Sequence, residues 1–355
     1  MENTIKCKKC LKEIPTNSDG KSLSKNGLCL ECYNIELKAQ DVNWIEKAEE
    51  FEEKIKKVRD SKGTFDGLVM LSGGKDSIYV AYILSKVYKL NIVALTIDNG
   101  FEYESTFDNS TDIAKKLGIS HFVYRLSVDD MKAYYNFLLT EESLKLKDSS
   151  QLCFFCGRLL KTISIKVAKM LNVTAVFSGH TLEQIRALGD EEGNGKSYDI
   201  RKRFVQTYSI QNYQKAIQAI KSKGLGSIEY LFEDNLATLD YEQFIYPLQY
   251  FEYKPIEIVE LLKRELGWVA DNHFSKKYIS SGCKLGKLME YIASQNGSST
   301  YVEREFSDQI RRGSISKDEV IEIIESRVDD DDEIKSIIQM LDVPKEKLFY
   351  GGSND

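Results

Sequence analysis

The hexapeptide Ser-Gly-Gly-Lys-Asp-Ser at residues 72–77 constrains the fold of this chain more than any other feature. It follows an apolar run at residues 68–71, which is typical of a buried strand, and it precedes apolar residues at helical spacing over 78–88. Glycines in such a turn let the backbone approach a phosphate, and the amino terminus of the helix adds N–H donors and a positive dipole. The hexapeptide therefore predicts a phosphate-binding loop, in which the lysine pairs with phosphate oxygens and the serines donate hydrogen bonds.

Strands and helices alternate downstream of this loop. Further strands are expected over residues 91–97, 120–126 and 173–178, and helices over 105–117, 129–146 and 157–171. The alternation predicts an α/β fold with a doubly wound parallel sheet, whose ligand site lies at the carboxyl ends of the strands. Because 355 residues are too many for one minimal domain, we expect a mini-domain (1–33), a linker helix (34–62), the α/β domain (63–250) and a helical region (251–355).

The loop differs from a Walker loop, because Val69 holds the place of the first glycine and Asp76 follows the lysine. Residues 71–77 instead resemble the PP-loop of the ATP pyrophosphatases, which have an adenine nucleotide alpha hydrolase-like fold. That group includes tRNA thiolation enzymes, asparagine and GMP synthetases and sugar amidotransferases. The resemblance implies an enzyme that adenylates a substrate carbonyl oxygen with ATP and releases pyrophosphate, after which a nitrogen or sulfur nucleophile displaces AMP.

The same resemblance implies roles for residues at two strand ends. Lys75 and Asp76 are expected to be catalytic, and Thr96 and Asp98, at the end of the second strand, are expected to contact adenine. The alternative for Asp98 is that it caps the following turn. The β,γ-pyrophosphate of ATP would be held, through Mg²⁺, by Ser72, Gly73, Gly74, Lys75, Asp76 and Ser77.

A Gly-His turn follows the fourth strand. Gly179 and His180 are expected to approach the nucleotide phosphates, and Glu183 or Gln184 to orient metal or substrate. The alternative for His180 is a structural histidine. The thiolation families show more acidic residues after this turn than the single Glu183 found here, so a metal role for Glu183 rests on one carboxylate.

Four of the seven cysteines form a Cys-x2-Cys repeat near the amino terminus: Cys7, Cys10, Cys29 and Cys32. The chain shows no secretory signal, so its cysteines are expected to be reduced thiols. Two such pairs predict a zinc ribbon with four thiolates around Zn²⁺. A unit of about thirty residues buries too little apolar surface to fold alone, so metal binding would supply the folding energy.

The other three cysteines are Cys153, Cys156 and Cys283. Together with the Gly-His turn, the Cys-x2-Cys pair resembles the tRNA 2-thiolation family, in which three cysteines ligate a four-iron four-sulfur cluster. The resemblance implies that these three cysteines are catalytic cluster ligands, which leave one iron open to bind hydrosulfide. The alternatives are buried structural cysteines, a second zinc site, or a persulfide-carrying cysteine activated by a neighbouring cation such as Arg158.

The layout of the chain also resembles the N-acetyl sugar amidotransferases. The shared features are the amino-terminal cysteine pairs, a helix bearing Asn43 and Trp44, the PP-loop, and a tail at residues 307–319. That resemblance implies ammonia from a separate glutaminase and an acetamidino sugar as product. The three additional cysteines favour sulfur over nitrogen. A third hypothesis, a nucleotide-binding regulatory protein, is disfavoured by the intact Lys75-Asp76 pair.

The net charge and the distribution of apolar residues indicate which substrates and which cell compartment to expect. A net charge of −6 and the lack of a second ribbon near the carboxyl terminus favour a small molecule or nucleoside substrate over tRNA. No leader and no run of about eighteen apolar residues is present, so we expect a cytoplasmic protein that does not enter membranes. A sulfur donor or a glutaminase is the expected protein partner, and a homodimer the expected assembly.

Overall fold

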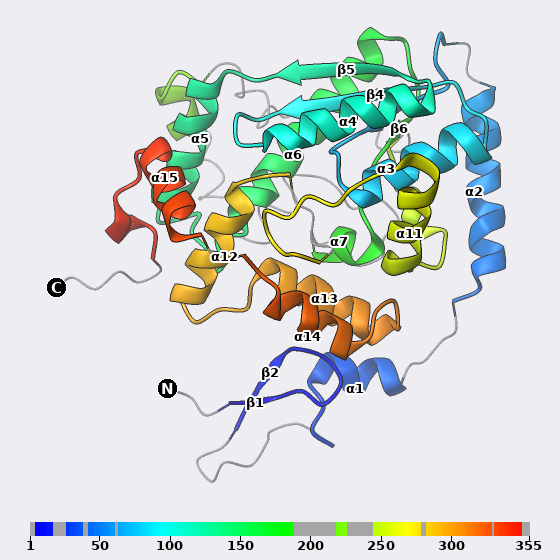
Figure 1. Ribbon diagram of the computed structural model, residues 1–355. Coiled ribbons are helices and arrows are strands. Elements are labelled where there is room, and N and C mark those ends of the chain that lie inside the picture. Colours follow the sequence, from blue (N-terminus) through cyan, green and yellow to red (C-terminus); the bar gives the residue numbers. More distant parts are fainter. Residues whose placement is uncertain are drawn as a thin grey trace.

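The chain forms a five-stranded parallel sheet with helices packed against it (Figure 1). The computed structural model describes residues 4–16, 26–37, 42–60, 63–187, 218–225, 244–277, 282–328 and 330–349. The predicted α/β class and the four predicted parallel strands are confirmed. The strands lie in the order β5 (Ser120–Arg125), β4 (Ile92–Asp98), β3 (Gly67–Met70), β6 (Val176–Phe177) and β7 (Phe244–Ile245).

The fifth strand, β7, was not predicted. It pairs with β6 in parallel, through Val176 with Phe244 and Phe177 with Ile245. Two residues are too few to show an alternating pattern, so periodicity could not reveal this strand. The only local signal is the apolar run before Pro247, where a 3-10 helix begins.

Helices cover both faces of the sheet, as expected for a doubly wound fold. Leu68 and Val93 point into one core, whereas Val69 and Ala94, their neighbours in sequence, point into the other. The first core is completed by α5 (Val128–Thr140), α6 (Gln151–Met170), α12 (Leu285–Gln295) and α15 (Asp331–Leu341). The second is completed by α2 (Trp44–Arg59), α3 (Lys75–Tyr82), α4 (Glu104–Leu117) and α11 (Pro255–Leu266).

Several helix limits differ from the prediction. Helix α6 begins at Gln151 instead of residue 157, so the cysteine pair lies inside its first turns. Helix α5 ends at Thr140 instead of residue 146, because Glu141 adopts an extended backbone. The predicted linker helix is divided into α1 (Leu30–Leu37) and α2. The domain limits at residues 33, 62 and 250 remain predictions.

The carboxyl-terminal region is helical, and its helices begin and end with clear signals. Pro255 opens α11, and Gly267 ends it with φ of 59°. Ser316 and Glu319 form a capping box at the start of α14 (Lys317–Glu325). Helix α13 (Tyr301–Arg312) lies just before it. None of the helices within the described ranges has the length and apolar character needed to cross a membrane.

The amino-terminal unit docks against α13 and α14 (Figure 1). It consists of the hairpin β1 (Thr4–Lys6) and β2 (Glu13–Pro15) followed by α1. The Lys317 ammonium donates a hydrogen bond of 2.8 Å to the carbonyl oxygen of Cys7. Leu11 packs against the small core formed by Ile310, Ile315, Val320 and Ile323.

Candidate functional site

The predicted phosphate loop lies between β3 and α3. Gly73 has φ of +71°, and a Cβ atom at this position would lie 2.8 Å from the carbonyl oxygen of Thr106. Only glycine fits both the backbone angle and the space. The indole N–H of Trp268 donates to the carbonyl oxygen of Gly73 across 3.1 Å, so the shape of the loop is fixed from the carboxyl-terminal region.

Polar side chains of the loop hold one another. Ser77 Oγ accepts from the backbone N–H of Ser72 at 3.1 Å and donates to the carbonyl oxygen of Gly74 at 3.0 Å. Lys75 Nζ lies 2.8 Å from Asp76 Oδ2. The other carboxylate oxygen of Asp76 accepts from the hydroxyl of Tyr253 at 2.7 Å. The lysine and the aspartate are thus oriented side by side at the amino terminus of α3.

The turn after β6 touches the phosphate loop. A Cβ atom on Gly179 would lie 2.6 Å from the backbone nitrogen of Ser77, so glycine is required for this close approach. His180 follows, and its Nδ1 lies 2.6 Å from Ser178 Oγ. Burial, together with the charge of Lys161, lowers the pKa of His180 to about 4. A neutral imidazole therefore stands at the point where the strand order of the sheet reverses.

Two acidic side chains from separate helices, Glu183 and Glu305, interact with each other, and Glu305 also interacts with Lys75 and Asp76. Glu183, in α7 (Leu182–Ala187), is 4% exposed and its Oε1 lies 3.3 Å from Arg312 Nε. Glu305, in α13, accepts from the side-chain amide of Gln184 at 3.0 Å. Burial, with the charges of Asp76 and Glu183, raises the pKa of Glu305 to about 7 against the opposing charge of Lys75. Sequence reasoning missed Glu305, because no local pattern connects α13 with the loop.

The two residues expected to contact adenine have other partners. Thr96 is 2% exposed, and its hydroxyl donates to the carbonyl oxygen of Leu71 at 2.6 Å. Asp98 accepts from the backbone N–H of Gly100 at 2.8 Å and pairs with Arg125 at 3.3 Å. The alternative expected for Asp98, a cap of the following turn, is the arrangement observed. An adenine contact by either side chain remains a prediction.

The three remaining cysteines meet near the end of β4. The side-chain amide nitrogen of Asn99 lies 3.6 Å from the sulfur of Cys156 and 4.0 Å from that of Cys283. The Tyr135 hydroxyl donates to Cys156 at 3.0 Å. The Cys153 sulfur lies 3.3 Å from the sulfur of Met289, in α12. Asn99, Tyr135 and Met289 were not predicted, since they come from three separate elements.

Burial controls the protonation of these thiols. It raises the pKa of Cys153 to about 12 and that of Cys156 to about 11, and it raises the pKa of Cys283 well above its ordinary value. Glu102 pairs with Cys283 through a backbone bridge, and burial with the charge of Asp98 raises its carboxyl pKa to about 7. The thiols are therefore neutral near pH 7 without a metal. The side chain of Arg158, the cation expected to activate a thiolate, is not among those that the structure describes.

One cavity of about 400 Å³ joins the loop to the cysteines. Its wall includes the phosphate loop, the Gly-His turn, Glu102 and Glu305, together with Cys153 and Cys283. The fold thus brings these two cysteines to the same space as the residues expected to hold ATP.

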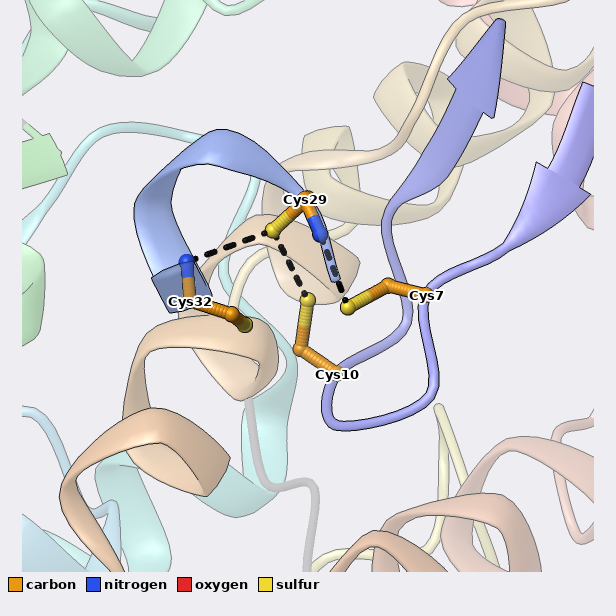
Figure 2. A group of neighbouring side chains, drawn as sticks. All are labelled: Cys7, Cys10, Cys29 and Cys32. Carbon is orange, nitrogen blue, oxygen red and sulfur yellow. Dashed lines mark hydrogen bonds between the residues drawn. The ribbon is translucent and has the colours of Figure 1, made fainter. Parts of the chain in front are cut away.

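Cys7, Cys10, Cys29 and Cys32 converge in the amino-terminal unit (Figure 2). All four are buried, and their sulfurs lie within 4.8 Å of one another. The sulfurs of Cys10 and Cys29 are 3.7 Å apart, close to the separation of about 3.8 Å that tetrahedral Zn–S bonds of about 2.3 Å require. Backbone N–H groups also point at these sulfurs, as from Cys29 to Cys7 at 3.3 Å. The four residues fit a closed, four-coordinate metal site.

The chain matches a known family over its α/β core. Residues 66–207 match the model of the queuosine biosynthesis protein QueC. This match starts at β3 and includes the phosphate loop, the cysteine pair and the Gly-His turn. Residues 66–207 are therefore a QueC-like domain of the PP-loop ATP pyrophosphatase superfamily, as the hexapeptide indicated.

Curated relatives share parts of the chain. The uncharacterized protein MJ1599 of Methanocaldococcus jannaschii is 23% identical over 180 residues, which are 50% of this chain and 60% of that protein. The cytoplasmic tRNA 2-thiolation protein 1 of Arabidopsis thaliana is 29% identical over 119 residues, 32% of each chain. This chain therefore spans less than two thirds of the length of these relatives.

Among solved structures, the U34-tRNA thiolase NcsA from Methanococcus maripaludis with its [4Fe-4S] cluster is similar at 19% identity and a TM-score of 0.35. The aligned region covers 88% of this chain and 87% of that one.

Proposed function

We propose that this protein is an ATP-dependent enzyme that adenylates a carbonyl oxygen of its substrate and replaces that oxygen with sulfur. The observation that carries the proposal is the shared cavity, whose wall holds both the phosphate loop and the pair Cys153 and Cys283. An adenylated carbonyl must meet its nucleophile before water does, so the activating and the sulfur-bearing residues need to share one enclosed space. Relatives that include a tRNA 2-thiolation protein support this reading.

The loop residues account for the activation step. The N–H groups at the start of α3 and the Lys75 ammonium would bind the β,γ-phosphates, which develop negative charge as pyrophosphate leaves. Asp76 and Glu183 offer the carboxylate oxygens that Mg²⁺ prefers. The neutral imidazole of His180, beside Ser178, can exchange hydrogen bonds with phosphate oxygens without adding charge.

The three cysteines outside the ribbon would form the site that supplies the sulfur. Cys153, Cys156 and Cys283 are partly buried cysteines with contacts to Asn99 or Met289, and three thiolates are a ligand set for a four-iron four-sulfur cluster. When bound, such a cluster would supply an iron position for sulfide. Asn99 and Tyr135 would then donate hydrogen bonds to the ligating sulfurs. A persulfide on a free cysteine has less support, because it needs a thiolate and burial raises all three thiol pKa values.

The substrate in this proposal is a small molecule or a nucleoside, with a sulfur donor protein as partner and tRNA as the less favoured substrate. Zn²⁺ in the amino-terminal ribbon, Mg²⁺, ATP and the cluster are the proposed cofactors. The net charge of −6 supports the smaller substrates.

The decisive experiment is anaerobic purification followed by analysis of iron, acid-labile sulfide and zinc. We expect about four irons and one zinc per chain. The variant Cys283→Ala should lose iron and keep zinc, whereas Cys10→Ser should lose zinc and keep iron. A colourless protein that carries only zinc and still releases pyrophosphate from ATP would refute sulfur transfer by an iron-sulfur cluster.

Nitrogen transfer, as in the sugar amidotransferases, is the second candidate. One observation favours it: the ribbon and the tail at 307–319, both shared with that family, are in direct contact through Lys317 and the carbonyl oxygen of Cys7. Ammonia would then replace sulfide, with a glutaminase as partner. Formation of an amidine from an N-acetyl sugar, ATP and ammonia by the Cys283→Ala variant would establish this candidate, and nucleotide binding without any pyrophosphate release would instead indicate a regulatory protein.

A further inference from the structure

The last turn of α13 contacts both the four-cysteine cluster and α7, the helix that follows the Gly-His turn. Arg311 Nη2 lies 3.8 Å from the sulfur of Cys10. Arg312, the next residue, places its Nε 3.3 Å from Glu183 Oε1. Consecutive residues of a helix point about 100° apart, so one helix end can face two neighbours at once.

A single carboxylate connects the two arginines. Asp308 binds Arg311 through Oδ1 and Arg312 through Oδ2, each at 3.4 Å. Its position three and four residues before the arginines places all three side chains on adjoining faces of α13. Cys10, Arg311, Asp308, Arg312 and Glu183 thus form a continuous series of contacts, which we call the charge chain.

The members of the charge chain are shielded from water. The exposed fraction of the side chain is 10% for Arg311, 22% for Asp308 and Arg312, and 3% for Glu183. Charge pairs that are removed from solvent are weakly screened, so a change in charge at one end is felt by the next member. Ion pairs on the exposed surface of a helix are strongly screened, so a change in charge would have a much smaller effect on the next residue.

A metal in the cysteine cluster would set the charge at one end. A divalent ion held by four thiolates carries a net charge of about −2, and Arg311 is the cation placed against it. Without the metal, Arg311 would lose this anionic partner, and its interaction with Asp308 would change. Asp308 also binds Arg312, which pairs with Glu183, three residues after His180 of the Gly-His turn.

We propose that the charge chain makes Arg311 and Arg312 positioning residues for the phosphate site, so that metal in the ribbon holds Glu183 and the Gly-His turn in place. Metal binding in the ribbon would then affect the conformation of the phosphate site. Two measurements test this inference, hydrogen exchange and the binding of an ATP analogue. Only the second one rests on the proposed function.

The experiment uses the full chain and hydrogen exchange measured by mass spectrometry over residues 72–77 and 178–184. Cys10→Ser, which loses the metal, and Arg311→Ala, which keeps it, should each raise exchange in these segments at least about fivefold, the lower end of typical coupling between sites. The double variant should exchange no faster than either single one. Arg311→Lys should restore part of the protection, because it keeps the charge.

Lys317→Ala is the matched control. It removes a contact between the ribbon and α14 without touching the charge chain, so exchange in both segments should stay at the wild-type rate. The second readout is the Kd for Mg²⁺ and a non-hydrolysable ATP analogue, which should rise at least about fivefold in Cys10→Ser and in Arg311→Ala.

Unchanged exchange in Cys10→Ser would overturn the inference. So would equal effects of Lys317→Ala and Arg311→Ala, since simple docking of the ribbon would then suffice. If the wild-type protein does not bind ATP, the proposed function fails, and the exchange measurement still decides whether the ribbon positions the loop.

Discussion

Trp268 donates its indole N–H to the carbonyl oxygen of Gly73 across 3.1 Å, and the two residues are separated by 195 positions in the chain. Gly73 lies in the phosphate loop, and its backbone is in the left-handed region. Trp268, 2% exposed, follows the end of α11 and packs in the core beneath α3. The conformation of the most specific motif in the sequence is therefore held by a residue far outside it.

Replacing Trp268 by Phe should leave the carbonyl of Gly73 without its donor. A buried acceptor that loses its partner costs about 1–3 kcal/mol, so we expect a loss of stability of this size in urea unfolding, with weaker binding of Mg²⁺ and ATP. Trp44→Phe, at the partly exposed start of α2, is the control and should change stability by less than about 0.5 kcal/mol. Equal effects of the two substitutions would argue against a role for the indole hydrogen bond.

Gly179→Ala should displace the phosphate loop. The added Cβ would meet the backbone nitrogen of Ser77 at 2.6 Å, and backbone cannot move aside as a flexible side chain can. Pyrophosphate release from ATP should fall at least about a hundredfold, the scale of loss for a displacement near 1 Å. Gly157→Ala, inside α6 with open space around its Cβ, should keep the wild-type rate.

Glu305 should make the stability of the metal-free protein depend on pH. Its pKa of about 7 in the folded state exceeds the ordinary value of 4.5, so the folded state binds more protons in this range. The stabilising contribution is complete below about pH 4.5 and is lost as the pH rises through 7. Glu305→Gln should therefore gain stability relative to wild type between pH 5 and 8 in urea unfolding. A difference that stays constant with pH would show that Glu305 does not titrate in this way.

Loading of the three-cysteine site should be steeply dependent on pH. Burial holds the thiols of Cys153 and Cys156 protonated at pH 7, with pKa values of about 12 and 11, and a metal must displace those protons. Apparent affinity for ferrous iron should rise by about tenfold for each proton released per unit of pH. Calorimetry in buffers of different ionisation enthalpy would count the protons. Release of no protons in the Cys10→Ser background, where the ribbon cannot compete, would contradict this account.

Much of this architecture could be predicted from the sequence because its signals are local. The hexapeptide at 72–77, the apolar runs of β3 and β4 and the capping box at Ser316 each depend on neighbours within a few residues. The Cys-x2-Cys spacing is local in the same way, and the four cysteines that it groups do converge in the structure. These patterns are enough to indicate the fold class and the PP-loop superfamily.

Only the tertiary structure decided which distant residues meet. The two-residue strand β7 is too short to carry a period, and Glu305, Asn99 and Trp268 reach the site from separate elements. The sequence allowed Asp98 either to contact adenine or to cap the following turn. In the structure it accepts a hydrogen bond from the backbone N–H of Gly100. Such contacts depend on packing over long sequence separations, which no local pattern records. The sequence by itself therefore determined a glycine-rich loop between a strand and a helix, whereas packing alone decided that Cys153 and Cys283 would line the same cavity as that loop.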